Sequence, residues 1–338
     1  MPTPFRYVVP VTREAASGPV AEVYGQMARD FGLARMPLFM TLSPAPDVLV
    51  AAWAALRESL LAGTASRTGK EVVATGVSLA NRCPFCVDAH TVLLHATGDH
   101  GLAETIARGE TPGSPEHARL LAWAQATSGA VAGPAAPAPF PPGGAAEYVG
   151  TALAFHFVNR MVSALLTDDF LPGGLQRSRL VRRVGGRAMS RAVRRGAVAG
   201  DALPLLEGLP TGPEPGWAEG TPIGRAFAAL RGVALSDEVP LGEEAMWHVA
   251  GEVARWDGGH PPPGRAAAPP DALPPADRPA ARRALLAALA PYRITDADVA
   301  AWRDAARGDD ADLVRLLAFG AVTAVDRIEA ALAPTVPA

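Results

Sequence analysis

Residues 71–90 read Glu71-Val-Val-Ala-Thr-Gly-Val-Ser-Leu-Ala-Asn-Arg-Cys83-Pro-Phe-Cys86-Val-Asp-Ala-His90, and this stretch carries the clearest structural signal in the chain. Two segments of helical character meet in it at a short turn. Pro84 suits the first position of a helix, because the missing N–H of proline costs nothing there. Cys83 is therefore predicted to cap the second helix, and Cys86 is predicted to lie in its first turn.

The position of the two cysteines favours thiol chemistry. Unpaired backbone N–H groups and the positive end of the helix dipole stabilise a thiolate at a helix N-terminus. His90 follows Cys86 by four residues, so both side chains lie on one face, where an imidazole can accept the thiol proton. Glu71 begins the preceding helix, and only tertiary geometry decides whether its carboxylate reaches the sulfurs. The candidate catalytic residues are Cys86, Cys83, His90 and Glu71.

Three other interpretations of the cysteine pair are open at this point. A structural zinc site needs four ligands, and Asp88 or His95 would have to join the two cysteines and His90 at an unusual spacing. A thioredoxin-like site also places C-x-x-C at a helix start, but it needs a strand before the motif, and residues 71–82 have helical character. The third interpretation is a pair of buried, inert thiols, although both cysteines of the chain share one helical turn with a histidine.

The motif resembles a known family. Glu71, followed twelve residues later by Cys-x-x-Cys and then by His90, resembles the active-site motif of the alkylhydroperoxidase AhpD / carboxymuconolactone decarboxylase family. The residues around the cysteines are similar to the peroxidase-related branch of that family, and Asn159-Arg160 resembles a later helix of the branch. The resemblance covers residues 10–170 well and residues 220–332 weakly. It implies an all-α, AhpD-like helical bundle that usually forms oligomers, often trimers or hexamers of the catalytic unit.

The resemblance also implies roles for the site residues. Cys86 resembles the peroxidatic thiol that becomes a sulfenic acid, and Cys83 resembles the resolving thiol that closes the disulfide. His90 and Glu71 resemble the proton relay, with Glu71 acting through water. No metal, haem or flavin cofactor is implied, and electrons would come from an external dithiol such as a lipoyl group. The best-studied members carry a His beside the second cysteine, where this chain has Pro-Phe. A relay without that imidazole is expected to be slower or to serve another substrate.

The composition is that of a protein with a sizeable apolar core. Hydrophobic residues make up 49% of the 338 residues, and the net charge of −3 argues against nucleic acid as the main partner. No apolar run reaches the ~20 residues of a membrane-spanning helix, and the N-terminus lacks the features of a signal peptide. We therefore expect a cytoplasmic protein without a membrane partner. In that reducing compartment a lone C-x-x-C indicates redox or metal chemistry.

Helical periodicity recurs along the chain, whereas alternating strand patterns are scarce. The predicted helices cover 18–31, 46–62, 67–82, 84–97, 101–109, 115–127, 144–166, 176–196, 221–232, 242–256, 276–290, 295–306 and 310–332. We predict an AhpD-like catalytic domain over 1–172, an Arg-rich helix with a Pro-rich linker over 173–220, and a cysteine-free helical domain over 221–338. Residues 159–165 and 326–332 resemble each other at the ends of two Ala-rich helices. The last domain is therefore interpreted as a degenerate AhpD-like repeat.

The stretch 176–195 carries eight arginines and no acidic residue. Its apolar side chains recur at helical spacing and predict one apolar face: Leu180, Val181, Val184, Ala188 and Ala192. A solvated amphipathic helix is one interpretation, and a docking face for an acidic partner such as a lipoyl carrier domain is the other. Elsewhere, His95 and His100 are interpreted as ordinary polar positions, and His156 as a core or interface residue.

These observations predict a thiol-dependent hydroperoxide reductase or disulfide reductase that uses the Cys83/Cys86 pair with a His90/Glu71 proton relay. Its expected partners are a hydroperoxide or disulfide substrate, a dithiol or lipoyl-carrier reductant, and further copies of itself. A non-redox enzyme like carboxymuconolactone decarboxylase and a non-catalytic redox sensor are the alternatives. The C-x-x-C pair argues against the decarboxylase. Turnover of hydroperoxide with excess dihydrolipoamide would separate an enzyme from a sensor.

Overall fold

The computed structural model describes residues 3–33, 35–131, 133, 136–262 and 273–333. Its helices are α1 (Gly18–Asp30), α2 (Pro37–Leu42), α3 (Pro46–Leu56), α4 (Arg67–Ala80), α5 (Pro84–Thr97), α6 (His100–Ala107), α7 (Pro115–Ala126), α8 (Ala145–Leu165), α9 (Arg179–Arg195), α10 (Pro222–Ala234), α11 (Glu243–Ala254), α12 (Arg278–Leu289), α13 (Asp296–Ala306) and α14 (Asp310–Leu332). The described residues contain no β-strand, only isolated bridges that join Phe5 to Leu166 and Ala62 to Ala197. The all-α fold is therefore confirmed. None of the described helices combines the length and the apolar character needed to cross a bilayer.

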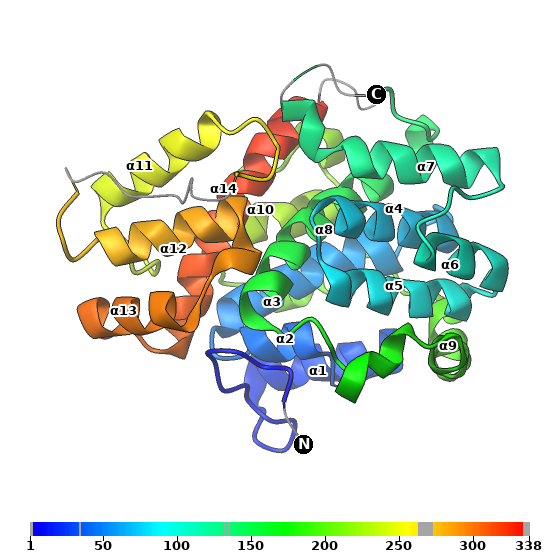
Figure 1. The fold of residues 1–338 in the computed structure, drawn as a ribbon, viewed down its shortest axis with the longest axis horizontal. Helices are drawn as coiled ribbons and strands as arrows, with labels where there is room; N and C mark the ends of the chain where they lie inside the picture. Colours follow the sequence, from blue (N-terminus) through cyan, green and yellow to red (C-terminus); the bar gives the residue numbers. More distant parts are fainter. Residues whose placement is uncertain (1–2, 34, 132, 134–135, 263–272, 334–338) are drawn as a thin grey trace.

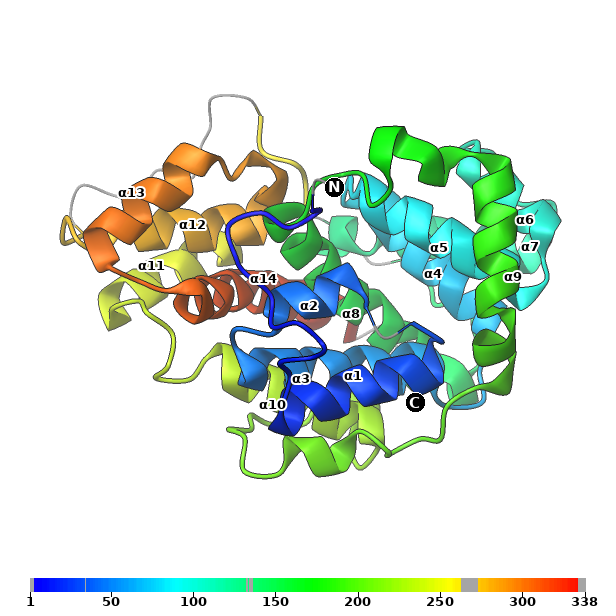
Figure 2. The same cartoon turned by 90° about the horizontal axis from the view of Figure 1, so that it is seen from below.

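The predicted helices are all present, with ends that differ from the prediction by at most three residues. The long predicted helix 46–62 consists of α3 followed by a π-helical turn, Arg57–Leu61. Helix α2 was not predicted, because a six-residue segment is too short to show a helical period. Figures 1 and 2 show α4 to α7 and α9 gathered on one side, α11 to α13 on the other, and α8 and α14 between them.

The core is formed by α3, α8, α10 and α14. Helix α3 packs against α10, and α8 packs against α14. Both α3 and α8 are buried along nearly their whole length, and one hydrophobic cluster extends from the first helices to the last. The similar segments 159–165 and 326–332 therefore end two helices that lie against each other. The duplication and the three-part domain division stay predictions, and residues 263–272 and 334–338 of the last part lie outside the described residues.

The sequence around the C-x-x-C motif forms a hairpin of α4 and α5. Helix α4 ends in a Schellman motif, in which the N–H of Cys83 donates to the carbonyl of Ser78 at 3.0 Å. The N–H of Arg82 donates to the carbonyl of Leu79 at 3.2 Å, and Arg82 takes the left-handed conformation of this motif, with φ 54°. Cys83 is then the N-cap of α5, and Pro84 is its first residue, as predicted. The same short turn thus ends one helix and begins the next at the first sulfur.

The Arg-rich helix α9 packs along α5. Its buried residues are Arg182, Gly186, Met189, Ala192 and Val193. The predicted apolar face is confirmed at Ala192, which is buried. It is wrong at three other positions, because Leu180 and Val184 are 70% and 57% exposed and Ala188 is exposed as well. Two contacts explain the difference: Arg182 pairs with Glu104 of α6 at 2.7 Å, and Gly186 allows a close approach to α5. Docking of an acidic partner on the exposed face stays a prediction.

Candidate active site

Both cysteines are buried at the N-terminal end of α5. Cys83 is 1% exposed and Cys86 is 3% exposed. Their Sγ atoms lie 2.6 Å apart, and both are free cysteines. Phe85 lies between them in sequence and packs edge-to-face against Phe170, with ring centroids 5.1 Å apart. The two sulfurs are close enough to bond to each other without movement of the helix.

Glu71 reaches the site through His90. Its Oε2 lies 2.6 Å from Nδ1 of His90, and its Oε1 accepts a hydrogen bond from Nε of Arg67 at 2.8 Å. Burial of Glu71 raises the pKa of its carboxyl group, but the charges of Arg67 and His90 outweigh burial and lower this pKa below its usual value. The carboxylate is therefore ionised at neutral pH and can stabilise a protonated imidazole. The helical hairpin thus brings together two of the predicted site residues that lie nineteen positions apart.

His90 lies one turn after Cys86 on α5, as predicted. Its ring stands edge-on to Phe155, with centroids 4.5 Å apart. In the described part of the chain, neither sulfur has a hydrogen bond to this imidazole. Proton transfer between His90 and Cys86 therefore requires a bridging group such as a water molecule or the substrate.

Asn159 of α8, which is not among the predicted site residues, also contributes to the site. Burial raises the pKa of the Cys86 thiol well above its usual value, and contact with Cys83 raises it further, whereas a hydrogen bond from Asn159 lowers it. The resting thiol is therefore protonated at neutral pH. This differs from the thiolate expected at a helix N-terminus, because the cost of burying the charge exceeds the helix-end effect.

A chain of hydrogen bonds orients Asn159. Nδ2 of Asn81 donates to Oδ1 of Asn159 at 2.9 Å, and Nδ2 of Asn159 donates to Oγ of Ser78 at 3.0 Å. Asn81 also lies 3.1 Å from Nδ1 of His156, and Nε2 of His156 lies 2.7 Å from Oγ1 of Thr127. Burial lowers the pKa of His156 well below its usual value, so its neutral ring accepts from Asn81. The sequence signal that could have indicated Asn159 as a site residue was a set of polar residues inside an otherwise apolar helix.

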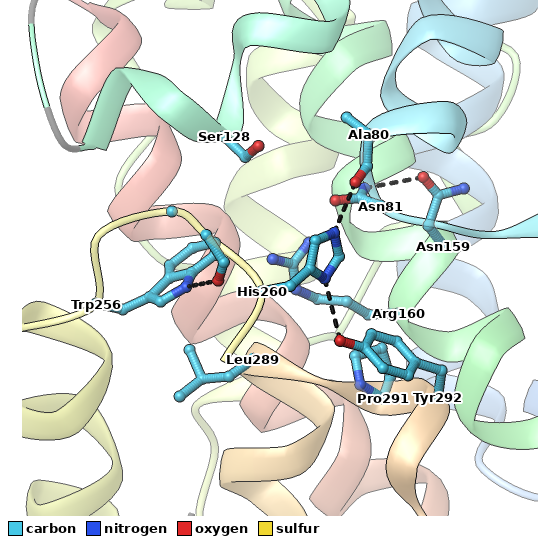
Figure 3. A pocket seen from close by; sticks show the side chains of 12 residues that line it. Ala80, Asn81, Ser128, Asn159, Arg160, Trp256, His260, Leu289, Pro291 and Tyr292 are labelled. Atoms are coloured by element: carbon cyan, nitrogen blue, oxygen red, sulfur yellow. Dashed lines mark hydrogen bonds between the residues drawn. The ribbon is translucent and has the colours of Figure 1, made fainter. Parts of the chain in front are cut away.

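A small pocket lies beside this network, and Figure 3 shows its lining. Residues from both parts of the chain contribute to it, among them Asn81, Asn159, Arg160, Trp256, His260 and Tyr292. Nε2 of His260 lies 2.8 Å from the carbonyl oxygen of Ala80, and the hydroxyl of Tyr292 lies 3.2 Å from its Nδ1. The cysteine-free last part of the chain therefore forms one wall of a pocket that neighbours the dithiol.

The side chains that could complete a zinc site with the cysteines are engaged elsewhere. Asp88 pairs with Arg177 at 3.3 Å. His95 lies 2.8 Å from Glu104 and 2.9 Å from His100, at the far end of α5. The C-x-x-C motif also follows helix α4 instead of a strand, so its surroundings are not thioredoxin-like.

Comparisons with known proteins relate both the site and the whole chain to one family. A sequence profile of the carboxymuconolactone decarboxylase family matches residues 48–136, which include the α4–α5 hairpin and all four predicted site residues. A curated protein of Mycobacterium tuberculosis, named alkyl hydroperoxide reductase, is 43% identical over 336 residues, which cover 95% of this chain and 93% of that protein. No solved structure matches the chain.

Proposed function

Because the chain belongs to the carboxymuconolactone decarboxylase family, in its AhpD-like form, we propose that it is a thiol-dependent hydroperoxide reductase. The observation that carries the proposal is the pair of sulfurs 2.6 Å apart at the start of α5, next to a Glu71–His90 contact of 2.6 Å. The name of the mycobacterial relative supports the same reaction class.

In the proposed cycle Cys86 is the attacking thiol. His90 removes its proton through a bridging group, and Glu71 stabilises the imidazolium that forms. The thiolate attacks one peroxide oxygen and the O–O bond breaks. The alkoxide leaves and takes up the proton to give an alcohol, and Cys86 becomes a sulfenic acid. Cys83 then attacks that sulfur, which releases water and forms the disulfide.

The electrons come from an external dithiol, which we propose to be a lipoyl group or a lipoyl carrier domain. Its thiolate attacks the Cys83–Cys86 disulfide, and a mixed disulfide then resolves to two protein thiols and one oxidised carrier. One hydroperoxide and one dithiol are therefore converted into one alcohol, one water and one disulfide. This chain has Pro84-Phe85 between the cysteines, so His90 is the imidazole on α5 that can serve both proton-transfer steps.

Steady-state turnover of cumene hydroperoxide with excess dihydrolipoamide tests the proposal. Peroxide should remove both thiols of the chain, and the dithiol should restore them. Cys83→Ser should retain a sulfenic acid on Cys86 that a dimedone-type probe traps, whereas Cys86→Ser should label weakly at Cys83. A redox sensor would form the disulfide without turnover, and a decarboxylase-like enzyme would retain both thiols under peroxide. Two thiols that persist under peroxide would exclude the proposed reaction.

A further inference from the structure

The pocket beside the dithiol contains a buried positive charge without a counter-charge. Arg160 is 5% exposed, and in the described part of the chain no carboxylate pairs with it. Its Nε donates to the carbonyl of Ala288 and its Nη1 to the carbonyl of His156, both at 2.8 Å. The guanidinium lies 5.6 Å from the centre of the Trp256 ring. Burial lowers the pKa of Arg160 to about 10, so it is still charged at neutral pH.

The surroundings of this charge suit an anion. Two carbonyl hydrogen bonds offset part of the cost of burying Arg160, but neither supplies the opposite charge that stabilises a buried ion best. None of the residues that line the pocket is acidic. Ser128 also lines it, and its hydroxyl has no hydrogen-bond partner among the residues that the structure describes. The lining therefore offers a cation and a free hydroxyl donor, with no carboxylate to compete for either.

The size of the pocket limits what it can hold. Its volume is about 20 Å³. A buried water needs about 10–15 Å³, so the space admits one small polar group and excludes a whole substrate. A carboxylate head group meets this limit if the rest of its molecule lies outside. The N–H groups of Arg160 that do not donate to Ala288 or His156 can donate charge-assisted hydrogen bonds to a carboxylate.

We infer that this pocket binds the carboxylate of a small organic acid, and that the hydroperoxides reduced at the dithiol carry such a carboxylate. The inference about the hydroperoxides rests on the proposed function. Asn159 connects the two places, because it lines the pocket and its amide also contacts Cys86. Arg160 follows it on the same helix and holds the head group.

A binding measurement without peroxide tests the anion site. The probes are 4-isopropylbenzoate and the uncharged 4-isopropylbenzamide, titrated calorimetrically into the reduced full-length protein. The acid should bind more tightly than the amide, and Arg160→Gln should weaken binding of the acid about 10- to 100-fold. Arg255→Gln is the matched control. It removes an exposed arginine beside Trp256 that pairs with Glu252, and it should bind the acid as the unmodified protein does.

Two further variants distinguish loss of the anion site from loss of the folded structure. Arg160 also bonds the end of α12 through Ala288, so thermal unfolding of Arg160→Gln is measured alongside binding. Arg160→Lys retains the charge and should recover part of the affinity. Ser128→Ala leaves the Arg160 contacts intact and should weaken binding of the acid about 2- to 5-fold. Its result decides the question if Arg160→Gln does not fold.

Turnover then tests the substrate class. The ratio of kcat/KM for a carboxylate-bearing cumene hydroperoxide to that for cumene hydroperoxide should exceed one and should fall about 10- to 100-fold in Arg160→Gln. Acid and amide that bind equally, or a preference that survives both Arg160→Gln and Ser128→Ala, would overturn the anion site. Tight acid binding without any peroxide turnover would retain the site and reject the peroxidase. Equal turnover of both hydroperoxides would reject the inference that the substrates carry a carboxylate, and it would leave the anion site in place.

Discussion

Glu71 is the buried charge on which the candidate site depends. A fully buried carboxylate is unfavourable unless it is paired, and here Arg67 pairs with it from one turn away in the same helix. His90 approaches from the next helix and takes the second oxygen. The pair therefore links the start of α4 to the helix that carries the two cysteines. The same carboxylate contributes to folding and orients the imidazole.

Replacement of either residue of this pair should slow the reaction strongly while the protein stays folded. His90→Ala should reduce peroxide turnover by about 100- to 10,000-fold, the range for a positioned acid–base group. Glu71→Gln should reduce it less, because Glu71 acts through His90. Glu104→Gln is the matched control, since Glu104 is a buried carboxylate that contacts His95 at the other end of α5. Stopped-flow peroxide consumption and thermal unfolding check this. A reduced rate in Glu104→Gln together with an unchanged rate in His90→Ala would contradict the relay.

The raised pKa of Cys86 sets the expected pH dependence. Only the thiolate attacks peroxide, so the single-turnover rate should rise with pH through and beyond 9, the ordinary value of a thiol. Asn159→Leu removes the one contact that lowers this pKa and should shift the profile to still higher pH. Ser163→Ala, on the same helix, should leave the profile unchanged. A rate that levels off near pH 7 would contradict the raised pKa.

At the scale of elements, the helix that carries the two cysteines is held by its neighbours. Helix α5 packs against α4 on one side and along α9 on the other. Adjacent glycines in α9 face α5 and differ in what surrounds them. A Cβ on Gly186 would lie 2.5 Å from Cβ of His95, whereas a Cβ on Gly185 would lie 3.1 Å from a methyl group of Val92. The first contact involves rigid atoms, and the second involves a side chain that can turn.

The two glycines therefore predict different stability changes. Gly186→Ala should destabilise the protein by about 1–3 kcal/mol, because α9 must move away from α5. Gly185→Ala should be within about 1 kcal/mol of neutral, since the better helix propensity of alanine offsets the tighter contact. Urea unfolding of both variants measures the difference. Equal effects would show that α9 does not approach α5 as closely as described.

At the scale of the whole molecule, the first and last parts of the chain cover each other. Helix α10 covers α3, and α14 covers α8, so the apolar surfaces of the first part are buried by the last. The last part also supplies Trp256, His260 and Tyr292 to the pocket beside the dithiol. The degenerate repeat predicted for the last part would account for this arrangement, and it stays a prediction.

A fragment that ends at Leu171 tests this arrangement. It would lack α10 and α14 and should expose several hundred Å² of apolar surface, by order of magnitude. The fragment should therefore self-associate or aggregate, with strong binding of a hydrophobic dye, whereas the full chain should bind little dye. Light scattering and dye fluorescence at matched concentrations measure both. A fragment 1–171 that is monomeric, soluble and fully active would show that the last part is an independent module.

The sequence by itself determined the helices and the turn at the motif. Local causes act there: the 3.6-residue period, proline at the first position of a helix, and short capping segments. Cys83 as N-cap and Cys86 in the first turn follow from those causes, and so does His90 one turn later. Helix α2 was not predicted, because six residues do not define a helical period. The four predicted site residues lie in the predicted elements, and their roles in the reaction stay proposals.

Only the tertiary structure decided what surrounds those residues. The Glu71–His90 contact, the position of Asn159 against Cys86 and the buried side of α9 each depend on how two helices approach each other. The protonated state of Cys86 depends on burial, which no local pattern specifies. The pocket around Arg160 joins segments more than a hundred residues apart. Packing distances and desolvation are properties of the assembled core, so a pattern along the chain cannot supply them.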